Sequence, residues 1–398
     1  METIRRPTKD MNRKTFFIIT IALLSSIFDS KVFAFDLAVN NSDGVTLYYD
    51  YIAKGEELEV TYGSTPYSGV VTIPDEVFLS NRTLKVTGIA NQAFYYCYDL
   101  ISVTLGNNIT SIGNFSFCGC NNLARVSLGN NVETIGNDAF NGCSSLISFD
   151  IPESVTFIGD AAFYQCVNLL SITLPDKVSS IGDAAFYQCF SLLTLSIGTN
   201  VKSIGCSAFF ECTALTTIDV PDNVKIIGNY AFYGCNKLSS LTIGKDVTSI
   251  GNNAFNGADI KTIVSKIEEP FRIAGNTSNN KIFSKETFCD AILYVPTGTI
   301  NSYKTTEGWK DFVNIEEKST CNVQNLILSK AKLISEDGGI LKILGLDNGI
   351  IVKVYKIVGS HIVSVVSQDG MAVVNTNLRT GSVVIVRIGQ ESIKMAVK

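Results

Sequence analysis

Residues 169–189 read LLSITLPDKVSSIGDAAFYQC, and this stretch decides the fold because the chain repeats its pattern in phase. A phenylalanine recurs every 23 residues without a slip, at Phe94, Phe117, Phe140, Phe163, Phe186, Phe209, Phe232 and Phe255. A cysteine follows three residues later, at Cys97, Cys120, Cys143, Cys166, Cys189, Cys212 and Cys235, and Ala258 takes the eighth position. A fixed period of this length predicts a solenoid with one coil per repeat.

Each coil reads as a strand followed by turns. Residues 169–174 end in alternating apolar and hydroxyl side chains, as a half-buried β-strand does. Gly182 permits a tight turn or a close approach of the next coil. Residues 184–189 carry Phe186 and Cys189 at the spacing of one helical face, so we expect a short helical or 3₁₀ turn there. We expect the eight phenylalanine rings to form a continuous internal stack.

Composition and the N-terminus indicate an exported chain. Charged residues make up 17% of it, the formal net charge is −5, and no basic block follows residue 34, which argues against nucleic acid as a partner. Arg13 and Lys14 precede an apolar run over residues 16–28, and Val32 and Ala34 supply the small residues at −3 and −1 of a cleavage site after residue 34, the order of a secretory signal peptide. We expect residues 1–34 to be that signal and the mature chain to contain no transmembrane helix. A membrane anchor is the alternative, for which the apolar run is short.

The cysteines form a pattern that does not favour disulfides. Eleven cysteines in an exported chain would usually suggest them, but equivalent side chains of stacked coils point in parallel and are poorly placed to pair. We expect a ladder of reduced thiols packed in the core as small hydrophobic side chains. The candidates for reactive thiols lie outside the ladder and are Cys118, Cys206, Cys289 and Cys321.

The repeat resembles the BspA-like (bacterial surface antigen) leucine-rich repeat family. The motif is L-x-x-(V/I/L)-x-(L/I/V), then (G/P), then V-x-x-I-G-x-x-A-F-x-x-C, and it runs through residues 100–255. The Asn ladder of ordinary leucine-rich repeats is absent. The resemblance implies an α/β repeat solenoid of 23-residue coils over residues 89–265. It also implies an exported or surface protein with a binding role, in bacterial cases often adhesion to host proteins or other cells.

Three flanking regions are expected around the solenoid. Residues 35–88 contain short alternating runs and predict an N-terminal β cap, which would cover the apolar end of the stack. Residues 266–318 break the period and resemble the terminal cap of such repeats, with Trp309 in its core rather than on a ligand platform. Residues 319–398 are rich in Val and Ile and predict a compact β-sandwich.

The last region resembles the C-terminal sorting domain of type IX secretion cargo. Residues 352–359 match V-x-V-Y-x-I-x-G, and residues 378–381 match the start of a second motif, L-x-x-G-x-Y-x-V, although Val383 replaces its usual aromatic residue. The resemblance implies a secretion machinery as partner and release or tethering outside a Gram-negative cell. The alternative is a plain accessory β domain.

The residues needed for catalysis are missing from the pattern. The single histidine, His361, is expected at an exposed strand edge, so a Ser-His or Cys-His mechanism has no base. Asp150 and Asp219 share the predicted strand face but lie three coils apart, roughly 14 Å at about 4.8 Å per coil, which is too far for a glycosidase pair. No cysteine cluster has zinc spacing, and no phosphate loop or dinucleotide fingerprint occurs, so we expect no metal, cofactor or catalytic residue.

Two surfaces are candidates for binding an extracellular protein or glycan. The first is the outward face of the strands, whose residues are mostly hydroxylic: Ser171, Thr173, Thr194, Ser196, Thr217 and Asp219, with Arg125, Ser127, Ser148 and Asp150 in earlier coils. Short hydroxyls also stack well on a parallel sheet for purely structural reasons. The second is an aromatic stripe, one residue after each core phenylalanine: Tyr164, Tyr187, Phe210 and Tyr233. An exposed stripe favours recognition, and a buried one favours packing.

We therefore expect a non-enzymatic recognition or adhesion scaffold. Two alternatives stay open at this point. One is a structural surface component without a selective ligand. The other is a carbohydrate-active enzyme with its site in a flanking module.

Overall fold

The computed structural model describes residues 35–317, 332–336, 340–346, 348–356, 361–376, 378, 382–388 and 391–396. The expected signal peptide lies outside the described residues, as do Cys321 and parts of both motifs that suggested a sorting domain. The chain divides into two compact units, Met1–Leu169 and Leu170–Lys398, and each is described by itself.

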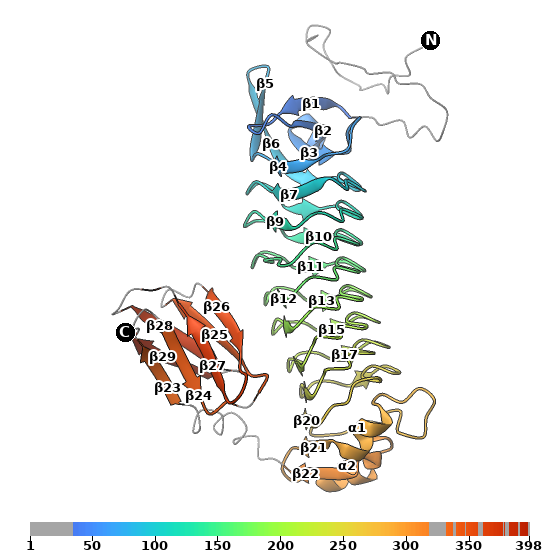
Figure 1. Cartoon of the computed structure of the whole chain (residues 1–398). Helices are drawn as coiled ribbons and strands as arrows, with labels where there is room; N and C mark the ends of the chain where they lie inside the picture. Colours follow the sequence, from blue (N-terminus) through green and yellow to red (C-terminus); the bar gives the residue numbers. More distant parts are fainter. Residues whose placement is uncertain are drawn as a thin grey trace. The chain divides into compact units, whose positions relative to one another are not determined.

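The first unit begins with antiparallel strands and continues as parallel coils (Figure 1). Its N-terminal strands are β1 (Leu37–Asn40), β2 (Thr46–Ile52), β3 (Glu57–Thr61) and the hairpin of β5 (Glu76–Leu79) with β6 (Arg82–Ile89), and the 3₁₀ turn η1 (Ala53–Gly55) links β2 to β3. One parallel ladder continues from β6 through β8 (Ser111–Ile112), β10 (Thr134–Ile135) and β11 (Phe157–Ile158). A second parallel sheet contains β4 (Gly69–Thr72), β7 (Leu100–Thr104) and β9 (Arg125–Ser127).

The second unit repeats the same two ladders. One contains β13 (Ser180–Ile181), β15 (Ser203–Ile204), β17 (Ile226–Ile227) and β19 (Ser249–Ile250). The other ladder is divided into two sheets. The first is the pair β12 (Ser171–Thr173) and β14 (Thr194–Ser196). The second contains β16 (Thr217–Asp219), β18 (Ser240–Ile243), β20 (Thr262–Ser265), β21 (Ile292–Val295) and β22 (Asn314–Glu317). Helix in this unit is short, namely α1 (Lys285–Asp290), α2 (Ile300–Thr305) and the 3₁₀ turn η2 (Trp309–Asp311).

The phenylalanine stack is present in both units. In the first unit, ring centroids lie 4.7 Å apart for Phe94–Phe117, 5.1 Å for Phe117–Phe140 and 5.4 Å for Phe140–Phe163. In the second, Phe186, Phe209, Phe232 and Phe255 follow one another at 5.1–5.2 Å with nearly parallel rings. All eight are fully buried, so this stack is the core that the period predicts.

The helical turn expected over residues 184–189 is wrong. Ala184 and Gln188 are both left-handed, with φ of 53° and 55°, and their amides donate to carbonyls of the next coil, Cys206 and Phe210, at 2.8 and 2.7 Å. Phe186 does the same to Ala208 at 2.7 Å. Every second amide therefore bonds to the neighbouring coil rather than within a helix. The solenoid is accordingly mostly sheet with little helix, and the α/β description overstated its helical part.

The repeated Ile-Gly pair sets how closely coils approach. At Gly205, an added Cβ would come within 2.6 Å of the carbonyl carbon and oxygen of Gly182 in the preceding coil. Real Cβ contacts are never this short, so only glycine allows the observed spacing. This confirms the close-approach role expected from the sequence.

The cysteine ladder is buried, and its thiols form no disulfides. Thiol groups donate to the carbonyl of the core phenylalanine one coil earlier, for example Cys120 Sγ to Phe94 O at 3.0 Å and Cys235 Sγ to Phe209 O at 3.3 Å. Burial raises the pKa of Cys97 to about 11 and that of Cys235 to about 12. These thiols act as small core side chains with a weak donor.

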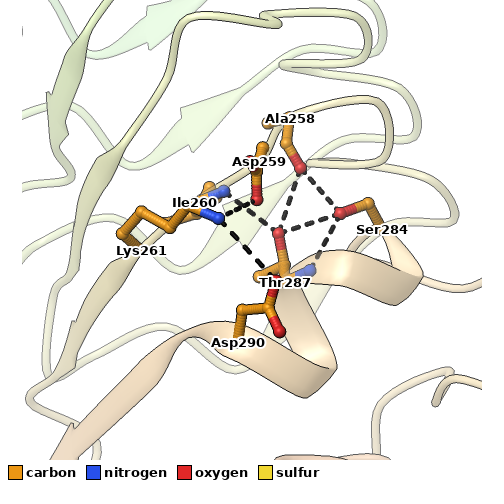
Figure 2. Close-up of polar contacts among 7 residues, drawn as sticks. All are labelled: Ala258, Asp259, Ile260, Lys261, Ser284, Thr287 and Asp290. Atoms are coloured by element: carbon orange, nitrogen blue, oxygen red, sulfur yellow. Dashed lines mark hydrogen bonds and ion pairs between the residues drawn. The ribbon is translucent and has the colours of Figure 1, made fainter.

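The segment after the last coil extends the aromatic stack of the core. Phe283 stacks on Phe255 at 5.4 Å, although it follows after 28 residues instead of 23. Figure 2 shows how α1 is tied to this coil: the hydroxyls of Ser284 and Thr287 both donate to the carbonyl of Ala258, at 2.7 and 3.0 Å. Ser284 also caps α1 by accepting the amide of Thr287.

Trp309 is fully buried and donates its indole N–H to the carbonyl of Phe271 at 2.8 Å, so its expected core position is confirmed.

The C-terminal residues form two antiparallel sheets. The first contains β23 (Lys332–Glu336), β24 (Ile340–Leu344) and β27 (Met371–Asn375), and the second contains β26 (His361–Val366), β25 (Ile351–Lys356), β28 (Val383–Ile388) and β29 (Glu391–Ala396). Alternate side chains of both sheets share one core, which includes Leu341, Val354, Val374 and Val386.

Candidate functional site

The outward residues of β12, β14 and β16 lie where the alternation predicts. Ser171 pairs in register with Thr194, and Thr173 pairs with Ser196, so each forms a row across two coils. Ser171, Thr173 and Asp219 are exposed, whereas Thr194, Ser196 and Thr217 are half-buried. β16 belongs to a different sheet from β14. The rows thus form short polar strips rather than one uninterrupted ladder.

The aromatic stripe forms in the second unit. Tyr187 stacks on Phe210 with centroids 4.6 Å apart and 3° between the ring planes, and Phe210 stacks on Tyr233 at 5.1 Å. All three are half-buried, as is Tyr164, which belongs to the first unit. Because the rings cover one another's faces, the stripe presents ring edges and hydroxyls to solvent.

A more exposed aromatic group, missed by the sequence reasoning, lies in the first coil. Tyr96 and Tyr98 are 46% and 51% exposed, and their rings stack at 5.5 Å. Tyr96 has a left-handed φ of 56°, and its ring occupies the space where a side chain at residue 119 would be, which Gly119 leaves open. The clue in the sequence was the run Tyr95-Tyr96-Cys97-Tyr98.

The structure also reveals a hollow on the strand face of the first unit. Within residues 35–169, β9 is the last strand of the sheet β4-β7-β9, and the following coil adds no strand to it. The amide of Leu105 donates to Ser127 O at 2.8 Å, but the amide of Leu128, one coil later, makes no equivalent bond in this unit. The hollow measures about 460 Å³ and is lined by Arg125, Ser127, Asn130, Ser148, Asp150 and Pro152, together with Val126, Leu128 and Ile151.

Phe149 lies at the interruption. The inward strand position carries Val103 and Val126 in the two preceding coils but a phenylalanine here. The Phe149 ring is buried and makes edge contacts with both Phe140 and Phe163, each at 4.8 Å between centroids. A close-packed core accommodates such a volume increase by moving backbone. Phe149 is the largest side chain at this inward position in the first unit, and it lies next to the hollow.

The hollow contains one positive and one negative group. Arg125 and Asp150 are both exposed, and neither side chain makes a hydrogen bond or ion pair with the described residues of the first unit. Ser127 and Ser148 place hydroxyls between them. Asp150 is the only acidic group in the lining, so the paired carboxylates of a glycosidase are not found there.

The remaining reactive groups are dispersed. His361 is exposed on β26, which is an edge strand of its sheet, and its Nε2 lies 2.8 Å from Ser364 Oγ. Cys206 and Cys289 are exposed. Cys118 is buried and its pKa is raised to about 11 by burial, so its expected reactivity is not supported. The described residues contain no cluster of three or more His, Cys, Asp or Glu side chains that could hold a metal ion.

The repeat region matches a known family model over residues 87–215 and 156–276. The model is described as the BspA type leucine-rich repeat region. This agrees with the resemblance seen in the sequence, and the leucine-rich repeat coils carry the strand face described above. No curated protein matches the chain.

The chain is similar to solved structures of leucine-rich repeat proteins. A leucine-rich repeat protein from Bacteroides ovatus is 23% identical with a TM-score of 0.53, covering 68% of this chain and 75% of that one. A leucine-rich cell surface protein from Faecalibacterium prausnitzii is 22% identical with a TM-score of 0.42, covering 73% and 97%. The leucine-rich repeat protein of T. pallidum is 27% identical with a TM-score of 0.39, covering 53% and 86%. In the described residues, no helix is long and apolar enough to cross a membrane.

Proposed function

We propose that this protein is an exported, non-enzymatic scaffold that recognises a protein or glycan at the cell exterior. The observation that carries the proposal is the combination of a rigid, fully packed repeat core with outward polar side chains in register between coils. Stacked coils of this kind create extended binding surfaces because each repeat adds the same frame with different exposed residues.

Export rests on two features of the sequence. Residues 1–34 have the order of a signal peptide, and residues 319–398 resemble a type IX sorting domain. We propose that the first directs export and that the second engages the secretion machinery of a Gram-negative cell. The two antiparallel sheets around one core are compatible with the β-sandwich that such a domain requires.

Two other functions compete with this proposal. A structural surface component would show no selective ligand. A carbohydrate-active enzyme would need two carboxylates in one cleft, and the hollow at Arg125 has one. The exposed aromatic residues Tyr96 and Tyr98 and the free charges of the hollow favour recognition over a purely structural role.

A binding screen of the purified full chain tests the proposal. The panel consists of extracellular-matrix proteins and glycans, presented beside a Tyr164/Tyr187/Tyr233→Ser variant of matched thermal stability. Selective binding that is lost in the variant would assign recognition to the aromatic stripe. Selective binding that is kept would assign it to the strand face, and no selective binding to any member of the panel would contradict the proposed function.

A further inference from the structure

We propose that the hollow beside β9 is a binding site for an acidic saccharide, with Arg125 contacting the sugar carboxylate and Asp150 accepting its hydroxyls. The inference rests on the proposed recognition function and names a site and a ligand class for it. Its chemistry comes from the lining, in which a cation, an acceptor-only carboxylate, two serine hydroxyls and an amide converge in about 460 Å³.

Arg125 is the group that selects an anion. Its guanidinium offers several N–H donors in a plane that matches a carboxylate, and such bonds are about twice as strong as neutral ones. Asp150 lies one coil further on and two residues along, so the two charges stand diagonally across the hollow. They form no ion pair with each other, which leaves both available to a ligand.

The remainder of the lining favours a sugar over a peptide side chain. Ser127, Ser148 and Asn130 are exposed and give hydrogen-bonding partners at several angles, as vicinal hydroxyls require. Pro152 and the partly buried Leu128 and Ile151 supply apolar surface for the C–H face of a ring. The lining has no aromatic residue and no deep apolar pocket, which are the usual anchors of a protein partner. The volume lies within the roughly 300–1,000 Å³ of small-ligand sites.

Calorimetric titration of the full chain tests the assignment. The probes are sialyllactose and trigalacturonate as carboxylated saccharides, lactose as the neutral control, and a Glu-Lys tetrapeptide as the peptide alternative. The variants are Arg125→Gln and Asp150→Asn, and Arg82→Gln on the β5–β6 hairpin is the matched control for loss of an exposed arginine. Thermal unfolding of each variant shows whether it remains folded.

We expect at least one carboxylated saccharide to bind and lactose not to bind. Arg125→Gln should weaken binding by about tenfold or more, and Asp150→Asn by about fivefold because a charge-assisted bond becomes neutral. Arg82→Gln should have no effect.

Two results would overturn the inference. They are equal affinity in Arg125→Gln and the unsubstituted chain, or tighter binding of the tetrapeptide than of either acidic saccharide. If acidic saccharides fail but another member of the matrix-protein and glycan panel binds selectively, the inference fails and the proposed function stands. If nothing in either panel binds, both fail.

Discussion

Replacing Phe209 by alanine tests the structural role of the ring stack. Phe209 is fully buried, with Phe186 at 5.2 Å on one side and Phe232 at 5.1 Å on the other. Removing a buried phenylalanine costs about 3–5 kcal/mol, because transfer energy is lost and the cavity closes only in part. Each stacked pair contributes about 0.5–1.5 kcal/mol of this. The rigid hydrogen-bonded coils on either side restrict collapse, so we expect a value near the upper end.

The loss should remain local because each coil contacts only its neighbours. We expect faster hydrogen exchange of amides in residues 203–212 and 226–235 and unchanged exchange over residues 111–135. Native-state exchange resolves these segments separately, which a single melting temperature does not.

The adjacent Phe210→Ala variant is the matched control, since it removes the same side chain from a half-buried position. It should cost clearly less, about 1–2 kcal/mol. Equal destabilisation by the two variants would refute the reasoning, as would a cost below about 1 kcal/mol for Phe209→Ala.

Three further predictions concern the thiol ladder, the glycine contacts and the C-terminal sheets. Burial raises the pKa of Cys97 to about 11 and of Cys235 to about 12, whereas an unfolded thiol ionises near about 8.5. Below that pH, both thiols are protonated in the folded and unfolded chain, and their contribution to the free energy of unfolding is complete. As the pH rises toward the pKa values of the folded state, this contribution is lost by about 1.4 kcal/mol per thiol and pH unit. Urea unfolding between pH 8 and 11 should show this slope, and Cys235→Ala should reduce it while Cys206→Ala should not. Gly205→Ala should destabilise by about 1–3 kcal/mol, because its Cβ meets the backbone of Gly182; an unchanged urea midpoint would show that the coils can separate. Deleting residues 319–398 should trap the protein in the periplasm by cell fractionation, and normal surface display would refute the sorting role.

The repeat period carried most of the fold. Phe186 and Cys189 could be placed in the core because their positions recur with the same chemistry from coil to coil. Such recurrence shows which positions face inward even where a single coil would leave this open. The turn between them was misjudged, because the spacing of Phe186 and Cys189 also fits a helical face. The turn forms instead of a helix because its amides donate to carbonyls of the next coil. The sequence of a single coil does not indicate these acceptors. Phe283 escaped prediction because it continues the stack out of phase.

The candidate site was less accessible from sequence. Arg125 and Asp150 were recognised as outward residues of the strand face, yet nothing in their own spacing indicated a hollow between them. That feature lies beside Phe149, an inward residue that fits the apolar pattern and is larger than its counterparts Val103 and Val126. Periodicity arguments count apolar positions and ignore size, so they cannot detect such an interruption. The exposed rings of Tyr96 and Tyr98 were missed for a related reason, since only the position after each core phenylalanine was followed.

The uniform contact between coils has a genetic consequence. Each coil presents the same ring, glycine and carbonyl row to its neighbour, so a gene that gains or loses whole repeats by unequal recombination would still encode complementary junctions throughout. Phe283 stacks on Phe255, the ring of the last coil. A lineage could thus lengthen or shorten its reach in steps of one coil, and could duplicate or discard the coil with Phe149 as a unit. Selection would then act on the number and order of exposed surfaces while the packing between them stayed constant.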